Sequence, residues 1–330
     1  YPLNTQDGVP SVFPLQPEPD SDSDSDSERP RGCFAQWATT QAEQESKFPT
    51  ISLLPTALYP PERWLPSRMG GWWFTAAVGV IVHLGLLEFF RMAQFKGIRP
   101  ATKTTLVACQ LLLFSTQWAV QGGLPETISS AVLPLSGAAI CAWLLLQPVT
   151  GSIADVAASI FGLFYLGFLP SHWLSLRNLT LEQLAPGTAG WCSSGLAITL
   201  SACLMIVASD IGSWGFGQRW GRRSLSPISP GKTVEGTIGG FACAMAVGLI
   251  CAVLMGWPLL GLPGLLLGGL VALIGLVGDL TESMMKRDAG LKDSGDVLPG
   301  HGGILDRIDS YLFTPAVVYY AIALAQPFLK

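Results

Sequence analysis

Long apolar runs recur along most of the chain and predict membrane-spanning helices. An α-helix rises roughly 1.5 Å per residue, so about 20 apolar residues cross a hydrocarbon core about 30 Å thick. The runs number eight, at 71–90, 104–121, 127–147, 152–170, 189–208, 237–257, 262–280 and 311–328. This pattern predicts an all-α, polytopic transmembrane helical bundle of about eight spans.

The first 69 residues follow a different pattern. They are rich in proline, serine and acidic residues, and a Ser-Asp repeat occupies 19–28. A segment of this composition buries too little apolar surface to order itself. We therefore expect 1–69 to form a disordered tail, with 51–68 at the membrane surface, and 70–330 to form the transmembrane domain. Because the chain begins with Tyr1, we also expect its natural start to be missing or processed.

Charge is scarce and unevenly placed. Only 13% of the residues are charged, and ten of the 23 acidic residues lie in 1–69. The net charge of −4 gives no basic footprint for a nucleic-acid partner, so none is expected. Basic residues collect after the first, fifth and seventh spans, and the positive-inside rule places these connections on the cytoplasm-like side. Two spans separate 209–236 from 281–310, so these polar segments are predicted to meet at one membrane face.

The segment 283–309 is a polar island between apolar runs, with five acidic residues, four basic residues and a histidine. Polar groups are costly near a membrane, so such a cluster indicates a functional site. Helical spacing places four residues on one face if the seventh span continues: Asp279, Glu282, Lys286 and Arg287. Asp306 and Asp309 are three residues apart at the start of the last span, so we expect them to converge with Asp279.

Carboxylates beside lysine and arginine are what a magnesium–phosphate site requires. The hard cation takes oxygen ligands, and the basic groups hold phosphate oxygens. A flexible turn at 299–303 joins the two halves and carries His301. This histidine is a weak signal, because a hydrogen-bonding turn residue would look the same.

The segment 209–236 is predicted to be a loop, because glycines and prolines dominate it. Glycines let backbone N–H groups approach phosphates, and Lys232 adds a positive charge. The segment is not a Walker A loop, since position 226 is serine where that motif requires glycine. An ordinary polar connector is the alternative, although Asp210 at the edge of a membrane helix favours a functional role.

The residues of 283–309 form the pattern Ser-x-x-Lys-Arg-x4-Lys-Asp-x5-Pro-Gly-His-Gly-Gly-x-x-Asp-Arg-x-Asp, which resembles the signature of the phosphatidate cytidylyltransferases. Ser229–Gly236 is similar to that family's Ser-Pro-Lys-Lys-Thr-x-Glu-Gly, although Gly231 stands where the family usually has lysine. Asp210–Gly212 is similar to its Asp-x-Gly. The resemblance extends over 70–330 through Trp72-Trp73-Phe74 and Glu88-Phe89, and 152–167 looks like the cyanobacterial and plastid branch.

The resemblance implies a transmembrane nucleotidyltransferase of phospholipid biosynthesis. It would convert CTP and phosphatidic acid into CDP-diacylglycerol and diphosphate, with Mg²⁺ as cofactor. The family also implies a homodimer in a lipid bilayer. A chloroplast membrane is the first choice of location, and a bacterial inner membrane is the second.

The site residues follow from the matched motifs and, for Asp279 and Glu282, from their helical spacing at the end of the seventh span. We predict that Mg²⁺ is held by four carboxylates: Asp279, Asp306, Asp309 and Asp210. Phosphate groups are assigned to five basic residues: Lys286, Arg287, Lys292, Arg307 and Lys232. Glu282 and Asp293 are expected to support this shell or orient the lysines, and Ser283, Glu235 and His301 complete the substrate-binding set.

Two other functions are compatible with the residues alone. A CTP-dependent lipid kinase also needs a magnesium–nucleotide site at the membrane edge. An ion-coupled membrane transporter also clusters carboxylates inside the membrane. The charges of this chain lie at one membrane face rather than at the midplane, which disfavours the transporter.

Overall fold

The computed structural model describes residues 64–179, 193–295 and 302–325. Most of the predicted tail, 1–63, lies outside these residues, and the first described helix begins at Trp64. All described elements are helical: α2 (Trp64–Phe95), α3 (Thr102–Val120), α4 (Glu126–Leu145), α5 (Ile153–Gly162), the π-helix η3 (Leu163–Phe168), α6 (Leu169–Arg177), α7 (Ser194–Trp220), α8 (Val234–Met255), the short η5 (Leu259–Gly261), α9 (Leu262–Asp288) and α10 (Leu305–Ala325).

Seven helical stretches within the described residues are long and apolar enough to cross a membrane, at 71–95, 127–145, 153–177, 194–220, 234–255, 259–288 and 305–325. They confirm seven of the predicted spans, and the chain is an integral membrane protein. The other predicted span, 104–121, is the helix α3, which falls outside this set. Its glutamines and its Lys103 lower its hydropathy, yet α3 packs against α2 and α4 as a member of the bundle.

The fourth span is a composite of α5, η3 and α6. Ser152 begins it with a capping box, in which its hydroxyl accepts from the Asp155 N–H at 3.2 Å. The Asp155 carboxylate accepts in return from the N–H of Ser152 at 2.7 Å and of Arg99 at 2.6 Å. Asp155 therefore serves to begin this span and to fix the α2–α3 connection beside it.

The predicted loop at 209–236 is wrong over half of its length. The helix α7 continues to Trp220 and α8 begins at Val234, so the connection covers 221–233. A Cβ on Gly212 would lie 2.8 Å from Cys243 Sγ, and one on Gly240 would lie 2.7 Å from Ser209 O. These glycines let α7 and α8 pack closely, which is their common use in membrane bundles.

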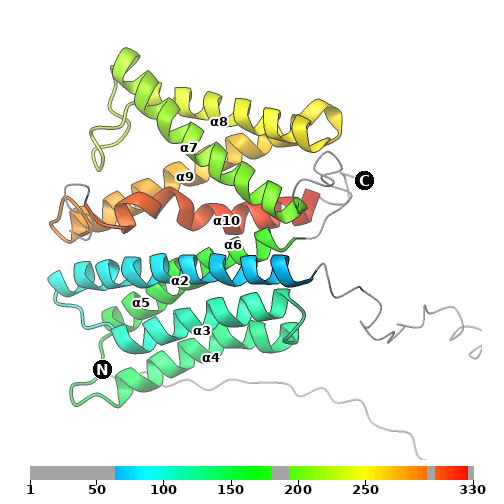
Figure 1. The fold of residues 1–330 in the computed structure, drawn as a ribbon. Coiled ribbons are helices and arrows are strands. Elements are labelled where there is room, and N and C mark those ends of the chain that lie inside the picture. The colour runs from blue at the N-terminus through cyan, green and yellow to red at the C-terminus, as the bar shows by residue number, and fades with distance from the viewer. Residues whose placement is uncertain (1–63, 180–192, 296–301, 326–330) are drawn as a thin grey trace, which may run out of the picture. The chain divides into compact units, whose positions relative to one another are not determined.

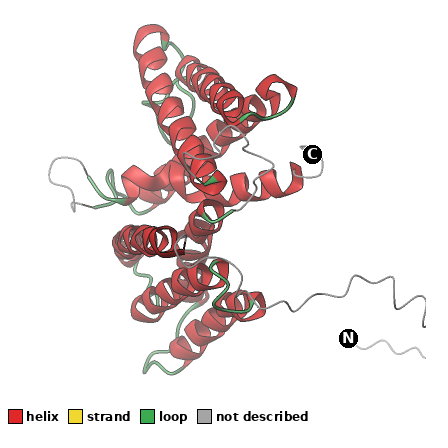
Figure 2. Ribbon diagram, turned by 45° about the vertical axis from the view of Figure 1, so that its right-hand side comes forward, coloured by secondary structure: helices red, strands yellow, loops and turns green. Residues whose placement is uncertain are grey.

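Two hydrophobic cores meet at α10, which lies between α9 and α2 in Figure 1; Figure 2 shows the same bundle turned by 45°. The first packs α2, α3, α4 and η3 against Leu312 and Ala316 of α10. The second packs α6, α7, α8 and α9 against Val318 and Ile322. Because α10 contributes to both cores, its start is held in a defined place relative to α2 and α9.

The polar connections gather at one end of the helices. Figure 1 shows the α2–α3 connection, the α7–α8 connection, the end of α9 and the start of α10 at the same end. Residues of 209–236 and of 281–310 line one cavity there. The prediction that these two segments meet at one face is confirmed.

Candidate active site

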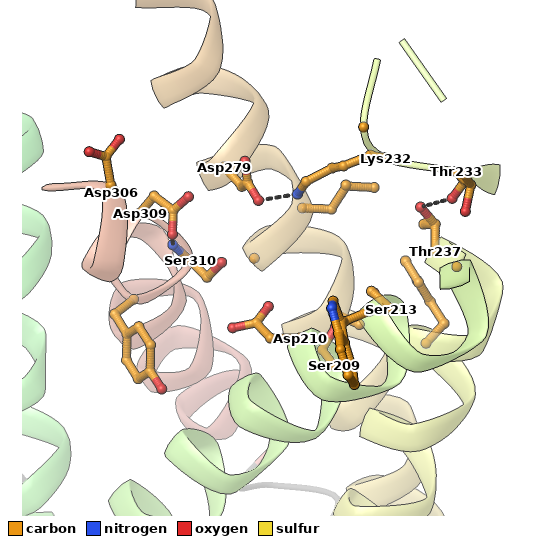
Figure 3. Close-up of a pocket in the computed structure, with 18 of the residues that line it drawn as sticks. Ser209, Asp210, Ser213, Lys232, Thr233, Thr237, Asp279, Asp306, Asp309 and Ser310 are labelled. Carbon is orange, nitrogen blue, oxygen red and sulfur yellow. Dashed lines mark hydrogen bonds and ion pairs between the residues drawn. The ribbon is translucent and has the colours of Figure 1, made fainter. Parts of the chain in front are cut away.

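A cavity of about 650 Å³ lies between α7, α8, α9 and α10. Its lining combines the carboxylates and bases predicted from the sequence with hydroxyl and aromatic side chains. The polar and charged side chains of the lining are those of Ser209, Asp210, Ser213, Gln218, Lys232, Thr233, Thr237, Asp279, Asp306, Arg307, Asp309 and Ser310. Figure 3 shows Asp210, Asp279 and Asp309 directed toward the same space.

Three carboxylates from two helices lie close together beside this cavity. Asp279 and Glu282 come from α9 and Asp309 comes from α10, and one oxygen of each lies within 4.8 Å of the others. Glu282 is only 1% exposed, and its Oε1 has no hydrogen-bond partner. A buried carboxylate oxygen without a partner is unfavourable unless a cation or a water molecule contacts it. The donor set therefore fits a hard divalent cation.

Asp306 lies in a different environment from Asp309. Its Oδ1 accepts from Lys286 Nζ at 2.6 Å, and its Oδ2 accepts from the N–H of Ser294 and of Gly303, both at 2.9 Å. Figure 3 shows its carboxylate pointing away from Asp210 and Asp309. Asp306 therefore holds the segment after α9 against the start of α10. The three-carboxylate cluster contains two of the four predicted metal ligands, Asp279 and Asp309, together with Glu282, and the metal assignment stays a prediction.

Lys286 joins the cluster to Asp306. Its ammonium group contacts Glu282 Oε2 at 3.0 Å and Asp306 Oδ1 at 2.6 Å, with only 13% of the side chain exposed. The helical face predicted for the end of the seventh span is thus confirmed, because α9 continues to Asp288. Lys286 does not line the cavity, so it acts on the site through the two carboxylates.

The α7–α8 connection brings Lys232 into an ion pair with Asp279 (Figure 3). The N–H of Leu225 donates to the Lys232 carbonyl at 2.8 Å, and a bridge pairs Ser224 with Thr233, which folds the connection back on itself. Thr233 then caps α8 by accepting from the Gly236 N–H at 3.1 Å. The backbone of Lys232 is therefore held by the folded connection before it and by the helix cap after it.

The remaining predicted site residues that the structure describes do not line the cavity. Glu235 accepts from the N–H of Arg222 at 3.0 Å and of Arg223 at 3.3 Å, so it supports the connection. Ser283 donates to Asp279 Oδ1 at 3.4 Å from behind the cluster. Three exposed residues after the cluster do not line the cavity: Arg287, Lys292 and Asp293. His301 lies outside the described residues.

Sequence reasoning missed the cavity residues on α7, because that stretch was interpreted as a loop. Counting helical turns onward from Asp210 gives Ser213, Trp214, Gly217 and Gln218, all of which line the cavity. The i, i+3, i+4, i+7 spacing was present in the sequence and would have found them.

The fold and the cavity define a helical membrane protein with a polar, carboxylate-lined site at one end of its spans. The profile of the cytidylyltransferase family matches residues 67–325. Because this match covers most of the chain, the protein belongs to the cytidylyltransferase family.

Named relatives agree with the family match. A phosphatidate cytidylyltransferase of Synechocystis sp. is 45% identical over 278 residues, which cover 79% of this chain and 92% of the relative. The protein named phosphatidate cytidylyltransferase 4, chloroplastic, of Arabidopsis thaliana is 37% identical over 270 residues, covering 76% of this chain and 67% of the relative. A phosphatidate cytidylyltransferase of Bacillus subtilis is 31% identical over 253 residues, covering 76% of this chain and 89% of the relative.

Proposed function

We propose that the protein is a phosphatidate cytidylyltransferase, which converts CTP and phosphatidic acid into CDP-diacylglycerol and diphosphate. The observation that carries the proposal is the cavity between α7 and α10, where four carboxylates and two basic side chains, Lys232 and Arg307, line one polar space beside the three-carboxylate cluster. Its position at the end of the transmembrane helices suits one lipid substrate and one soluble nucleotide. The activity named for the relatives matches this arrangement.

The reaction needs charge neutralisation more than a strong base. A phosphate monoester has a second pKa of about 6, so the phosphate of phosphatidic acid is largely dianionic at neutral pH. One of its oxygens attacks the α-phosphorus of CTP, the bond from that phosphorus to the diphosphate breaks, and diphosphate leaves. Positioning the two anions and compensating their charge then account for most of the catalysis.

We assign Mg²⁺ to the cluster of Asp279, Glu282 and Asp309, with Asp210 on the opposite wall of the cavity. When bound, Mg²⁺ would neutralise phosphate charge and draw the two anionic substrates together. The ion pair between Lys232 and Asp279 sets the charge balance of the free site. Arriving phosphate oxygens compete for the lysine, which frees the Asp279 carboxylate. Arg307 supplies a second cation on the α10 side.

The test is a cytidylyl-transfer assay with the purified protein in detergent. Phosphatidic acid, cytidine-labelled CTP and Mg²⁺ are supplied, and lipid-soluble label and diphosphate are measured together. We expect the two products in equal amounts, and we expect Asp279→Asn to lower the rate about 100-fold or more. Wild-type protein that inserts into the membrane but forms no lipid-soluble cytidine product would contradict the proposal.

The proposal extends to the membrane and to a second copy of the chain. The similarity to the chloroplastic Arabidopsis protein and to the Synechocystis protein supports a plastid membrane, with a bacterial inner membrane as the alternative. A homodimer is proposed as the working assembly. Fractionation of source membranes tests the location, and mass photometry of the detergent-solubilised protein tests the copy number.

A further inference from the structure

Glu88 lies on α2, which does not line the catalytic cavity, yet its carboxylate contacts the start of α10. Its side chain is buried, with the residue only 4% exposed. The carboxylate accepts from the N–H of Ile304 and of Leu305, both at 2.9 Å. A buried carboxylate is strongly unfavourable without hydrogen-bond partners. These two bonds therefore hold the Glu88 carboxylate and the backbone of Ile304 and Leu305 together.

The two amides are among those that have no intrahelical acceptor at the start of α10: Ile304 directly precedes the helix and Leu305 is its first residue. The N–H groups at a helix start have no intrahelical acceptor, and the helix dipole favours a negative charge there. The Glu88 carboxylate is the acceptor for both amides, and it comes from α2, more than 200 positions earlier in the sequence. Asp306 lies in the first turn of α10 and Asp309 follows three residues later, so Glu88 sets the direction in which α10 presents them.

A shared hydroxyl connects Glu88 to the carboxylates beside the cavity. Ser294 Oγ lies 3.1 Å from Glu88 Oε2 and 3.0 Å from Asp306 Oδ2. Asp306 contacts Lys286, which contacts Glu282 of the three-carboxylate cluster. A continuous set of polar contacts therefore leads from α2 through the segment after α9 to the proposed metal ligands.

The glycines around Glu88 leave room for this arrangement. A Cβ on Gly295 would lie 2.8 Å from Glu88 Oε1, and one on Gly303 would lie 2.5 Å from Glu88 Oε2. Gly303 belongs to the His-Gly-Gly part of the 283–309 pattern. Its lack of a side chain is explained here by the close approach of the Ser294 hydroxyl and the Glu88 carboxylate.

We propose that Glu88 is a positioning residue for the transfer reaction. It holds the first turn of α10 and the segment around Ser294, so that Asp309 faces Asp279 and Glu282 across the site. The proposal rests on the proposed cytidylyltransferase function for its kinetic consequence, while the structural consequence is independent of it.

The test compares Glu88→Gln, Glu88→Asp and the control Thr75→Val in the full chain. Thr75 is also buried on α2, and its hydroxyl bonds within that helix at 2.9 Å, so its loss removes a buried polar group away from the site. We expect both Glu88 variants to lower kcat roughly 10- to 100-fold with the KM for CTP changed by less than about threefold. Glu88→Asp keeps the charge but is one methylene shorter, so its loss of rate assigns the effect to position.

Hydrogen exchange gives a second readout that does not depend on turnover. In Glu88→Gln, peptides covering 302–309 should exchange faster, whereas peptides of α8 should exchange as in the wild type. Adding Ser294→Ala to Glu88→Gln should lower kcat little further, because both side chains act through the same contacts.

Three outcomes would overturn the inference: wild-type kcat in Glu88→Gln, exchange that rises equally in α8 and α10, or an equal loss of rate in Thr75→Val. If the wild-type protein itself transfers no cytidylyl group, the proposed function fails instead. The exchange measurement then still decides whether Glu88 holds the start of α10.

Discussion

The ammonium group of Lys286 lies between the carboxylates of Glu282 and Asp306. Its positive charge compensates the negative charge of these two side chains. Glu282 is 1% exposed and Asp306 is 12% exposed at the side chain. Removing one partner of a buried ion pair leaves an uncompensated charge, which is far more destabilising than losing an exposed pair. Sequence spacing predicted the shared helical face, and the family resemblance assigned the lysine to phosphate. Neither shows that Lys286 contacts both Glu282 and Asp306, because those contacts depend on how α9 packs against α10.

Lys286→Met should therefore destabilise the fold by about 3 kcal/mol. The matched control is Lys96→Met, which removes a lysine from an exposed pair with Asp288 at 3.0 Å and should change stability by less than about 1 kcal/mol. Unfolding in mixed micelles by increasing SDS measures both. Equal destabilisation of the two variants would show that the buried ion pairs of Lys286 contribute no more to stability than the exposed pair of Lys96.

Asp309→Asn should weaken the response to Mg²⁺, because it removes one charge from the three-carboxylate cluster. The Mg²⁺ concentration for half-maximal activity should rise about tenfold. Thermal stabilisation by Mg²⁺ should fall in the same variant, since a ligand that binds the folded state raises its stability. The control is Asp288→Asn, which removes an exposed acid near the end of α9. An unchanged Mg²⁺ response in Asp309→Asn would remove this residue from the metal assignment.

At the scale of single elements, the position of Lys232 depends on the start of α8. Thr233 caps this helix, and losing such a cap destabilises a protein by about 1 kcal/mol. Ser193 caps α7 in the same manner by accepting from the Leu196 N–H at 3.3 Å, and it is not part of the cavity lining. Removing each cap in turn therefore distinguishes an effect of helix stability from an effect of the position of Lys232.

Thr233→Ala should lower kcat/KM for CTP by roughly tenfold, because Lys232 loses its fixed backbone. Ser193→Ala should cause a similar loss of stability with an unchanged kcat/KM. Steady-state kinetics and SDS titration of both variants check this. Equal kinetic effects would mean that capping acts on the enzyme only through overall stability.

The helices also differ in how well the sequence alone predicts them. Apolar runs located the spans, because crossing a membrane demands a length and a composition that few other structures have. The end of α7 was misplaced, because Gly212 and Gly215 resemble loop residues when neighbouring helices are unknown. Glu88 was noticed only as part of the N-terminal resemblance, since contact between α2 and α10 is a property of packing.

At the scale of the whole transmembrane bundle, the residues that line the cavity come from separate segments between positions 209 and 311 but from one end of the helices. Parity of the spans predicted this meeting of 209–236 and 281–310 without any knowledge of packing. The depth of each carboxylate was not predictable, because it depends on how far α7 and α9 continue beyond their apolar parts. Residues between 209 and 218 of α7 and between 272 and 279 of α9 line the cavity.

The arrangement of the spans predicts opposite accessibility for two exposed positions. Ser224 lies in the α7–α8 connection on the cavity side, and Leu260, 91% exposed, lies in the α8–α9 connection at the other end. In a cysteine-free background, Ser224→Cys and Leu260→Cys should react with a membrane-impermeant maleimide from opposite sides of sealed vesicles. Labelling of both from the same side would contradict the assigned topology.

The central claim is that the cavity transfers a cytidylyl group to phosphatidic acid, and the most direct measurement follows each phosphorus of CTP. The purified protein is given phosphatidic acid, Mg²⁺ and CTP labelled at either the α- or the γ-phosphate. The account predicts that the α-label enters the lipid fraction and that the γ-label leaves as diphosphate. Entry of the γ-label into lipid would identify a CTP-dependent lipid kinase and contradict the account.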